Sequence, residues 1–137
     1  TSGFIKYGIL VYMLFRFYKR KRVVKVSSSH YVQHKEKARE LACSRVFYFN
    51  KLYNLSFNRI AIRNQRRVWG SCSGKGNLNF NYRIILLPAH LADYIIVHEL
   101  CHLKELNHSK KFWELVSLTF PNYKEARKEL KNYRFSI

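Results

Sequence analysis

Five consecutive residues, His98-Glu99-Leu100-Cys101-His102, form an H-E-x-x-H pattern. Side chains four residues apart are neighbours on one face of an α-helix, so His98 and His102 can converge on one zinc ion. Glu99 lies about 100° round the helix from His98, beside the open side of such a metal. Its carboxylate can there take a proton from a water that the zinc has acidified. The motif therefore predicts a zinc centre for hydrolysis, provided that the segment is helical.

His108 is the expected third zinc ligand. In an unbroken helix it would lie about 9 Å further along and about 240° round the axis from His102, out of reach of the metal. The chain must therefore turn between His102 and His108, and Asn107 is a residue type that accepts the left-handed backbone of such a turn. A glutamate as third ligand is the second choice. The candidates for that role are Glu114, Glu125 and Glu129.

The spacing of the three histidines also matches the metzincin pattern H-E-x-x-H-x-x-G-x-x-H. Glu105 stands where that pattern has glycine, and Met13, the only methionine, precedes the motif instead of following it. A metzincin is therefore not expected.

The apolar pattern predicts the elements upstream of the motif. Residues 9–26 are rich in Val, Ile, Tyr and Phe and are typical of one or two strands. Residues 32–53 have helical spacing, and Asn54 can close that helix in a left-handed cap. Short strands are expected at 57–62 and 68–72. After a turn at 73–77, alternation predicts a strand over 78–86.

Three helices are expected after these strands. The first begins at Pro88, runs to about Leu106 and carries the H-E-x-x-H pattern. The second spans about 110–120 and is stopped by Pro121. Asn122, with Glu125 three residues on, has the N-cap pattern of a last helix. This order predicts an α+β domain, with an antiparallel or mixed sheet packed against the motif helix.

Composition limits the class of protein. The 137 residues fit one domain, and 47% hydrophobic residues with only five Gly and two Pro exclude a disordered chain. The net charge of +18 predicts affinity for polyanions at low salt. Residues 1–35 carry eight basic and no acidic side chains. This basic segment could bind nucleic acid through phosphates and stacking, although no known nucleic-acid-binding module accompanies it.

The cysteines and the N-terminal apolar run bear on location. Three cysteines without a C-x-x-C pair favour a reducing compartment, so we expect a cytoplasmic protein. The run from Tyr7 to Phe15 is far shorter than the roughly 20 residues that span a bilayer, so no membrane span is expected. The cluster of basic residues from Arg16 to Arg22 follows this run, and only Lys6 directly precedes it, which is not the pattern of an export signal.

Four segments resemble the YgjP-like zinc metallopeptidases, relatives of the SprT and WLM proteases. They are Trp69-Gly70-Ser71-Cys72-Ser73; Gly76-Asn77-Leu78 with Asn81-Tyr82-Arg83; Asp93 to Leu103; and Asn107-His108-Ser109 with Phe112-Trp113 and Pro121-Asn122-Tyr123. Val68 departs from the pattern, because the family often has arginine directly before the tryptophan.

The resemblance covers about residues 31–133, so we expect a zincin-like metallopeptidase domain over 31–137. Residues 1–30 match poorly and form a basic and apolar N-terminal segment, expected as strands. The family implies zinc on His98, His102 and His108, Glu99 as general base, and a peptide or protein substrate. It also implies an alternative, a SprT-like protease acting on DNA-bound proteins.

A third hypothesis is a non-catalytic basic module that binds nucleic acid and whose histidines are structural. Such a site would usually be closed by four protein ligands. The oligomeric state stays open on sequence alone.

Other residues near the motif have simpler expected roles. Trp69 and Trp113 are expected in the core, and Cys72 and Cys101 as small buried hydrophobes. A catalytic centre for peptide hydrolysis also needs a group that stabilises the oxyanion. The candidates from sequence are Tyr82, Arg83, His90, Tyr94 and Tyr123.

Overall fold

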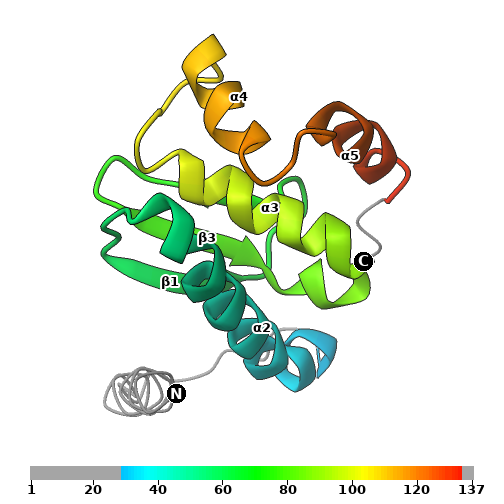
Figure 1. The fold of residues 1–137 in the computed structure, drawn as a ribbon. Coiled ribbons are helices and arrows are strands. Elements are labelled where there is room, and N and C mark those ends of the chain that lie inside the picture. Colours follow the sequence, from blue (N-terminus) through cyan, green and yellow to red (C-terminus); the bar gives the residue numbers. More distant parts are fainter. Residues whose placement is uncertain (1–28, 134–137) are drawn as a thin grey trace, which may run out of the picture.

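A computed structural model describes residues 29–133 (Figure 1). The strands expected within 9–26 lie outside this range. In chain order the elements are α2 (Ser29–Tyr53), β1 (Arg59–Arg63), β2 (Gly70–Cys72), β3 (Asn77–Asn81), the 3-10 helix η1 (Tyr82–Leu86), α3 (Ala89–Cys101), α4 (Lys110–Ser117) and α5 (Tyr123–Leu130). The predicted α+β class is confirmed.

The sheet is mixed and has the strand order β1-β3-β2. β1 runs parallel to β3, with Ile60 opposite Leu78 and Ile62 opposite Phe80, and these four side chains are buried. β2 runs antiparallel to β3 and forms one edge of the described sheet. The alternation in the sequence thus gives one apolar face, which helices cover, and one polar face.

The single strand expected over 78–86 is wrong beyond residue 81. The Asn81 side-chain oxygen accepts a hydrogen bond from the Arg83 backbone N–H at 3.0 Å and so caps η1. Tyr82, Arg83 and Ile84 are buried one after another, which the two-residue alternation of a strand facing solvent on one side does not allow. The sequence alternation beyond Asn81 therefore does not reflect a strand.

Helices α2 and α3 pack against each other and against the sheet, α2 beside β1 and α3 beside β2 and β3 (Figure 1). Arg45 of α2 holds Asp93 of α3 by two hydrogen bonds of 2.7 and 2.9 Å. Tyr53 at the end of α2 donates to the Leu115 carbonyl of α4 at 2.7 Å. These contacts fix α3 and α4 relative to the same long helix.

The ends of α2 and α4 and the start of α5 lie within three residues of the expected positions. α2 begins three residues earlier than expected and ends before Asn54, whose φ of 49° confirms the predicted left-handed cap. α4 ends at Ser117, before the expected position 120. Asn122 precedes α5 as predicted, but its side chain makes no capping hydrogen bond. None of the helices within residues 29–133 has the length and apolarity needed to cross a membrane.

Candidate metal centre

The H-E-x-x-H segment lies at the C-terminal end of α3. This helix is apolar on most of its surface, and its buried side chains include Leu91, Ile95, Ile96 and Leu100. His98 and Glu99 belong to its last turn, and His102 occupies the C-cap position. Packing of α3 on the sheet and on α2 therefore fixes the backbone from which all three polar side chains project.

The helix ends at Cys101, five residues before the expected Leu106. The Leu103 N–H donates to the Leu100 carbonyl at 3.1 Å and the Glu105 N–H to the Cys101 carbonyl at 3.0 Å. These tight turns redirect the chain directly after His102. The predicted left-handed Asn107 is wrong: among non-glycine residues of the described chain, positive φ occurs only at Asn54.

The reversal brings His108 back onto the two helix histidines. The three Nε2 atoms form a nearly equilateral triangle, with 3.2 Å between His98 and His102 and 3.1 Å from His108 to each of them. Three nitrogens placed about 2.0–2.1 Å from a tetrahedral zinc would lie about 3.3 Å apart. Within residues 29–133 these histidines form a group able to hold a metal ion.

Hydrogen bonds and burial keep the lone pairs of the histidine Nε2 atoms available to a metal ion. The Nδ1 atom of His102 lies 2.9 Å from the Glu105 carbonyl, which can only accept, so the neutral tautomer of His102 that fits this contact has its proton on Nδ1 and its lone pair on Nε2. The pKa of His98 is lowered to about 3, mainly by burial and to a smaller extent by the neighbouring His102 and His108. The pKa of His108 is lowered as well, chiefly by burial. Neutral imidazoles that converge in this way are the form that binds a metal.

Phe112 supports the histidine cluster from α4. It is fully buried, and its ring centroid lies 4.4 Å from that of His102, in a stacked arrangement, and 5.0 and 4.9 Å from those of His98 and His108. The Ser109 side chain accepts a hydrogen bond from the Phe112 N–H at 3.4 Å and caps α4. One aromatic ring thus contacts all three imidazoles and limits their rotation.

Glu99 lies between α3 and β2. It is only 6% exposed, and burial raises its pKa to about 8. A Cβ at Gly70 would lie 2.8 Å from Glu99 Cγ and 3.1 Å from Glu99 Oε1, so only glycine leaves room for the carboxylate. A carboxylate in such surroundings is a proton acceptor tuned toward neutral pH.

The buried carboxylate predicts a pH-dependent stability of the metal-free protein. The pKa of Glu99 rises from an ordinary value of 4.5 to about 8 on folding. Between these values the folded state holds a proton that the unfolded state has released, so this contribution to stability is lost as the pH rises through about 8. Metal-free Glu99→Gln should therefore gain stability relative to wild type between about pH 5 and about pH 9, as measured by urea unfolding. A difference that is constant with pH would contradict this burial.

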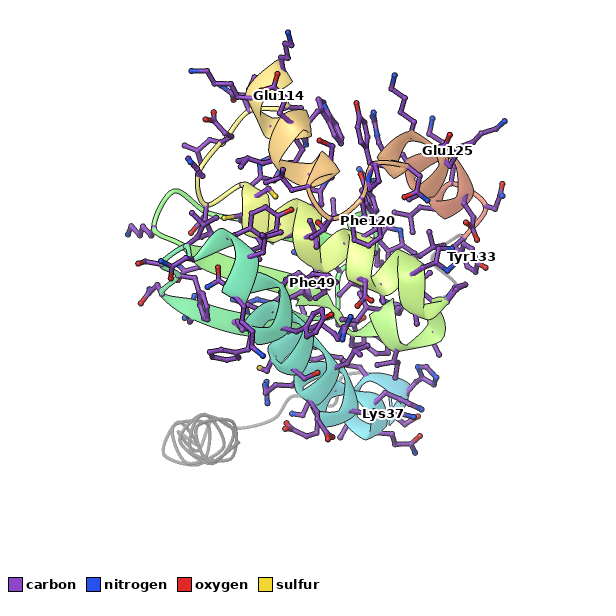
Figure 2. The ribbon with its side chains drawn as sticks, in the orientation of Figure 1. Lys37, Phe49, Glu114, Phe120, Glu125 and Tyr133 are labelled. Carbon is purple, nitrogen blue, oxygen red and sulfur yellow. The ribbon has the colours of Figure 1, made fainter. Side chains whose placement is uncertain are left out.

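The glutamates considered as third ligand lie elsewhere. Figure 2 shows Glu114 and Glu125 on the outer sides of α4 and α5. Glu114 Oε1 lies 4.0 Å from Lys110 Nζ, and Glu129 Oε2 lies 2.9 Å from His90 Nε2. The geometry therefore favours His108 over all three.

Of the oxyanion candidates, Tyr94 lies closest to the histidine cluster. Its hydroxyl is 3.3 Å from His98 Nδ1, and burial raises its pKa to about 12. Tyr123 stacks on Trp113 at 4.7 Å. Tyr82 and Arg83 are buried within η1, and His90 pairs with Glu129. Tyr94 is thus positioned to orient His98, with its phenol neutral at neutral pH.

The two tryptophans are only partly buried, so the expectation of simple core packing is incomplete. Both pack against the core, but Trp113 also stacks on His108 at 5.7 Å, and Trp69 lines the cavity beside Glu99. Cys101 is fully buried as predicted, whereas Cys72 is partly exposed. Burial raises the pKa of both thiols, to about 12 and about 11 respectively.

Sequence reasoning missed three contributors to the site. The roles of Gly70 and Phe112 depend on contacts between distant segments, although both residues lie in the segments that carry the family resemblance. Arg127 places its guanidinium 4.6 Å from the Trp113 ring, and no motif singled it out. The only sequence signal for it was its place in the helix expected after Pro121, where it lies in the last turn of α5.

Comparison with known proteins agrees with this geometry. Residues 18–133 match the family described as YgjP-like, metallopeptidase domain. The fold is similar to the crystal structure of the metallopeptidase zymogen of Pyrococcus abyssi abylysin, with a TM-score of 0.60 and 25% identity over 70% of this chain and 99% of that one. The metallopeptidase zymogen of Methanocaldococcus jannaschii jannalysin gives a TM-score of 0.53 and 23% identity over 69% and 94% of the two chains.

Comparison with curated proteins gave no match. The family match nevertheless spans most of the chain, including every residue of the histidine cluster and Glu99. The chain therefore belongs to the YgjP-like metallopeptidase family and is a metallopeptidase.

Proposed function

We propose that this metallopeptidase uses zinc held by His98, His102 and His108, with Glu99 as general base. The observation that carries the proposal is the triangle of Nε2 atoms, which lie 3.1–3.2 Å apart. The buried carboxylate of Glu99, the residue after His98 in α3, lies beside it. Three neutral imidazoles suit zinc and leave a position open, as in catalytic zinc sites. Zinc, when bound, supplies a Lewis acid that acidifies water and polarises the substrate carbonyl.

Glu99 then acts as the proton carrier. Its carboxylate accepts a proton from the attacking water and passes it to the leaving amine. A bound cation nearby would favour the charged form of Glu99, so the base is ready when the metal site is filled. Tyr94 holds the His98 ring through Nδ1, and Phe112 restricts all three imidazoles.

The substrate backbone pairs with the edge of β2. The Asn81 N–H donates to the Trp69 carbonyl and the Ser73 N–H to the Asn77 carbonyl, so residues 69, 71 and 73 bond toward β3. In an antiparallel pair the intervening residues direct their backbone groups to the other side. Gly70 and Cys72 therefore offer N–H and C=O groups to an extended peptide directly beside Glu99.

The test of this function is cleavage of an unfolded protein. Protein loaded with one zinc per chain should hydrolyse reduced, unfolded casein, and new N-termini should appear in mass spectra. Removal of the metal with a chelator should stop cleavage, and added zinc should restore it. Cleavage that persists in the metal-free protein would contradict the proposal.

Gly70→Ala should lower the rate of hydrolysis while keeping the metal. The new methyl group would displace Glu99 or push β2 away, and a misplacement of about 1 Å at a catalytic group costs up to about 10²-fold in rate. We expect kcat to fall about 10- to 100-fold, with zinc content unchanged in elemental analysis.

Gly74→Ala is the matched control. A Cβ at Gly74 has nothing within 4 Å, so this variant should cleave casein like wild type. Equal activities of the Gly70 and Gly74 variants would show that Glu99 does not need the space at Gly70.

A further inference from the structure

A cavity of about 400 Å³ opens beside His98 and Glu99. Three parts of the chain line it: one face of α3, the segment that leads into β2, and the end of α5 with the residues after it. Figure 2 shows Tyr133, one of the lining residues, just after α5. A peptide on the β2 edge would pass over this cavity, and its volume is in the range of pockets that hold small ligands.

The lining is strongly basic. Arg67 comes from the segment before β2, and Arg127 and Lys131 come from α5 and the residue directly after it. Glu99 is the one acidic side chain among the described lining residues, and it is buried, whereas the three cations are exposed. Within residues 29–133, none of the three cations forms an ion pair with a carboxylate. Their charge is therefore available to a ligand.

Both segments are held in place. Asn81 donates to the Gln65 and Val68 carbonyls at 2.7 and 3.0 Å, and this fixes the segment that carries Arg67. Arg83 adds a bond of 3.0 Å to the same Gln65 carbonyl. In α5, the guanidinium of Arg127 lies 4.6 Å from the Trp113 ring. The cations thus line a cavity whose backbone is already held in place, so binding there requires little reordering of that backbone.

We propose that this cavity binds an acidic side chain of the substrate, so that the enzyme prefers peptides with glutamate or aspartate close to the scissile bond. This inference rests on the proposed peptidase function, because it assumes that the peptide lies along β2 with its carbonyl at the histidine cluster. Each exposed ion pair contributes little by itself, so we expect the three cations together to give about tenfold selectivity for an acidic over a neutral side chain.

The observations favour a peptide over a nucleic acid as the occupant. The three cations converge on one cavity instead of following a strip of surface, as phosphate contacts along a strand would. The cavity also includes His98 and Glu99, which act on a carbonyl, and it adjoins the β2 edge. An oligonucleotide therefore serves as the competing ligand in the test.

The test compares quenched octapeptides of alanine and glycine that carry Glu, Gln or Lys at each of four central positions. In at least one position, kcat/KM of the zinc enzyme should be about tenfold higher for Glu than for Gln, and lowest for Lys. The Glu-to-Gln ratio should fall toward one in about 1 M salt, which screens exposed charges. In the double variant Arg67→Gln/Lys131→Gln it should fall to about two or three.

Lys37→Gln/Lys75→Gln is the control, since it removes the same charge from exposed residues outside the cavity and should keep the ratio. Lys37 lies on α2, far from α5 in Figure 2. Arg127 is left unchanged because its loss would also disturb Trp113. A binding measurement avoids turnover: zinc-loaded Glu99→Gln should bind the Glu peptide about tenfold more tightly than the Gln peptide.

Equal cleavage of Glu and Gln peptides at every position, or an unchanged ratio in the cavity variant, would overturn the inference and leave the peptidase function standing. Absence of any cleavage, with the binding preference intact, would instead overturn the proposed function. Displacement of the Glu peptide by a twelve-residue oligothymidylate at lower concentration than by the free Glu peptide would assign the cavity to nucleic acid and overturn the inference.

Discussion

Glu99→Gln is expected to lower kcat for peptide hydrolysis about 10²- to 10⁴-fold, the range that general base catalysis contributes. The amide has nearly the same shape as the carboxylate and fits the space left by Gly70, but it cannot accept a proton from water. The loss should appear in kcat and kcat/KM alike, because the proton transfer belongs to the transition state. Initial rates on a quenched peptide measure it.

The zinc content of the Glu99→Gln variant distinguishes a catalytic role of Glu99 from a structural one. Glu99 is not part of the histidine group, so the variant should keep one zinc per chain. In the metal-free state it should also be at least as stable as wild type at neutral pH, because folding no longer requires a buried carboxylate to take up a proton. Loss of less than about threefold in kcat, with zinc retained, would remove Glu99 from the mechanism.

His108→Ala is expected to abolish both zinc binding and activity. His108 is exposed, so its removal should leave the fold intact, but the remaining His98 and His102 supply only two nitrogens. Loss of a direct ligand should weaken zinc binding by more than the roughly 10- to 100-fold that loss of an outer partner costs. Competition with a zinc chelator of known affinity measures the change.

Two variants serve as controls for the histidine experiment. His90→Ala removes an exposed histidine that pairs with Glu129, away from the cluster, and should keep the metal. Glu114→Ala should keep it as well, because that carboxylate faces Lys110 on the outer side of α4. Zinc retained in His108→Ala but lost in Glu114→Ala would reverse the assignment of the third ligand.

The sequence predicted the α+β class, an antiparallel or mixed sheet and the helix that carries the motif, because apolar periodicity reports which faces are buried. It failed where local hydrogen bonds decide the backbone. Asn81 ends β3 by capping η1, and the alternation through residue 86 gave no sign of this. The turn before His108 forms through i to i+3 and i to i+4 hydrogen bonds after Cys101, so Asn107 needs no left-handed conformation.

In the candidate site, too, the sequence revealed some features and not others. The spacing of His98, His102 and His108 was readable because helix geometry places the first two together and a reversal was required for the third. The contacts that support them were not readable. Phe112 touches three imidazoles, and Gly70 makes room for Glu99, only because α4 and β2 fold back onto α3. The cations of the cavity come from segments about 60 residues apart, so no local pattern could pair Arg67 with Lys131.

X-ray absorption at the zinc K-edge, on protein with one zinc per chain, tests the ligand assignment most directly. We expect three imidazole nitrogens at about 2.0–2.1 Å from the zinc, together with at least one further light-atom ligand at a similar distance and no sulfur. His108→Ala reloaded with zinc should show one imidazole fewer or no bound zinc. A first shell with only two imidazoles in wild type, or with a thiolate sulfur at about 2.3 Å, would contradict the three-histidine centre.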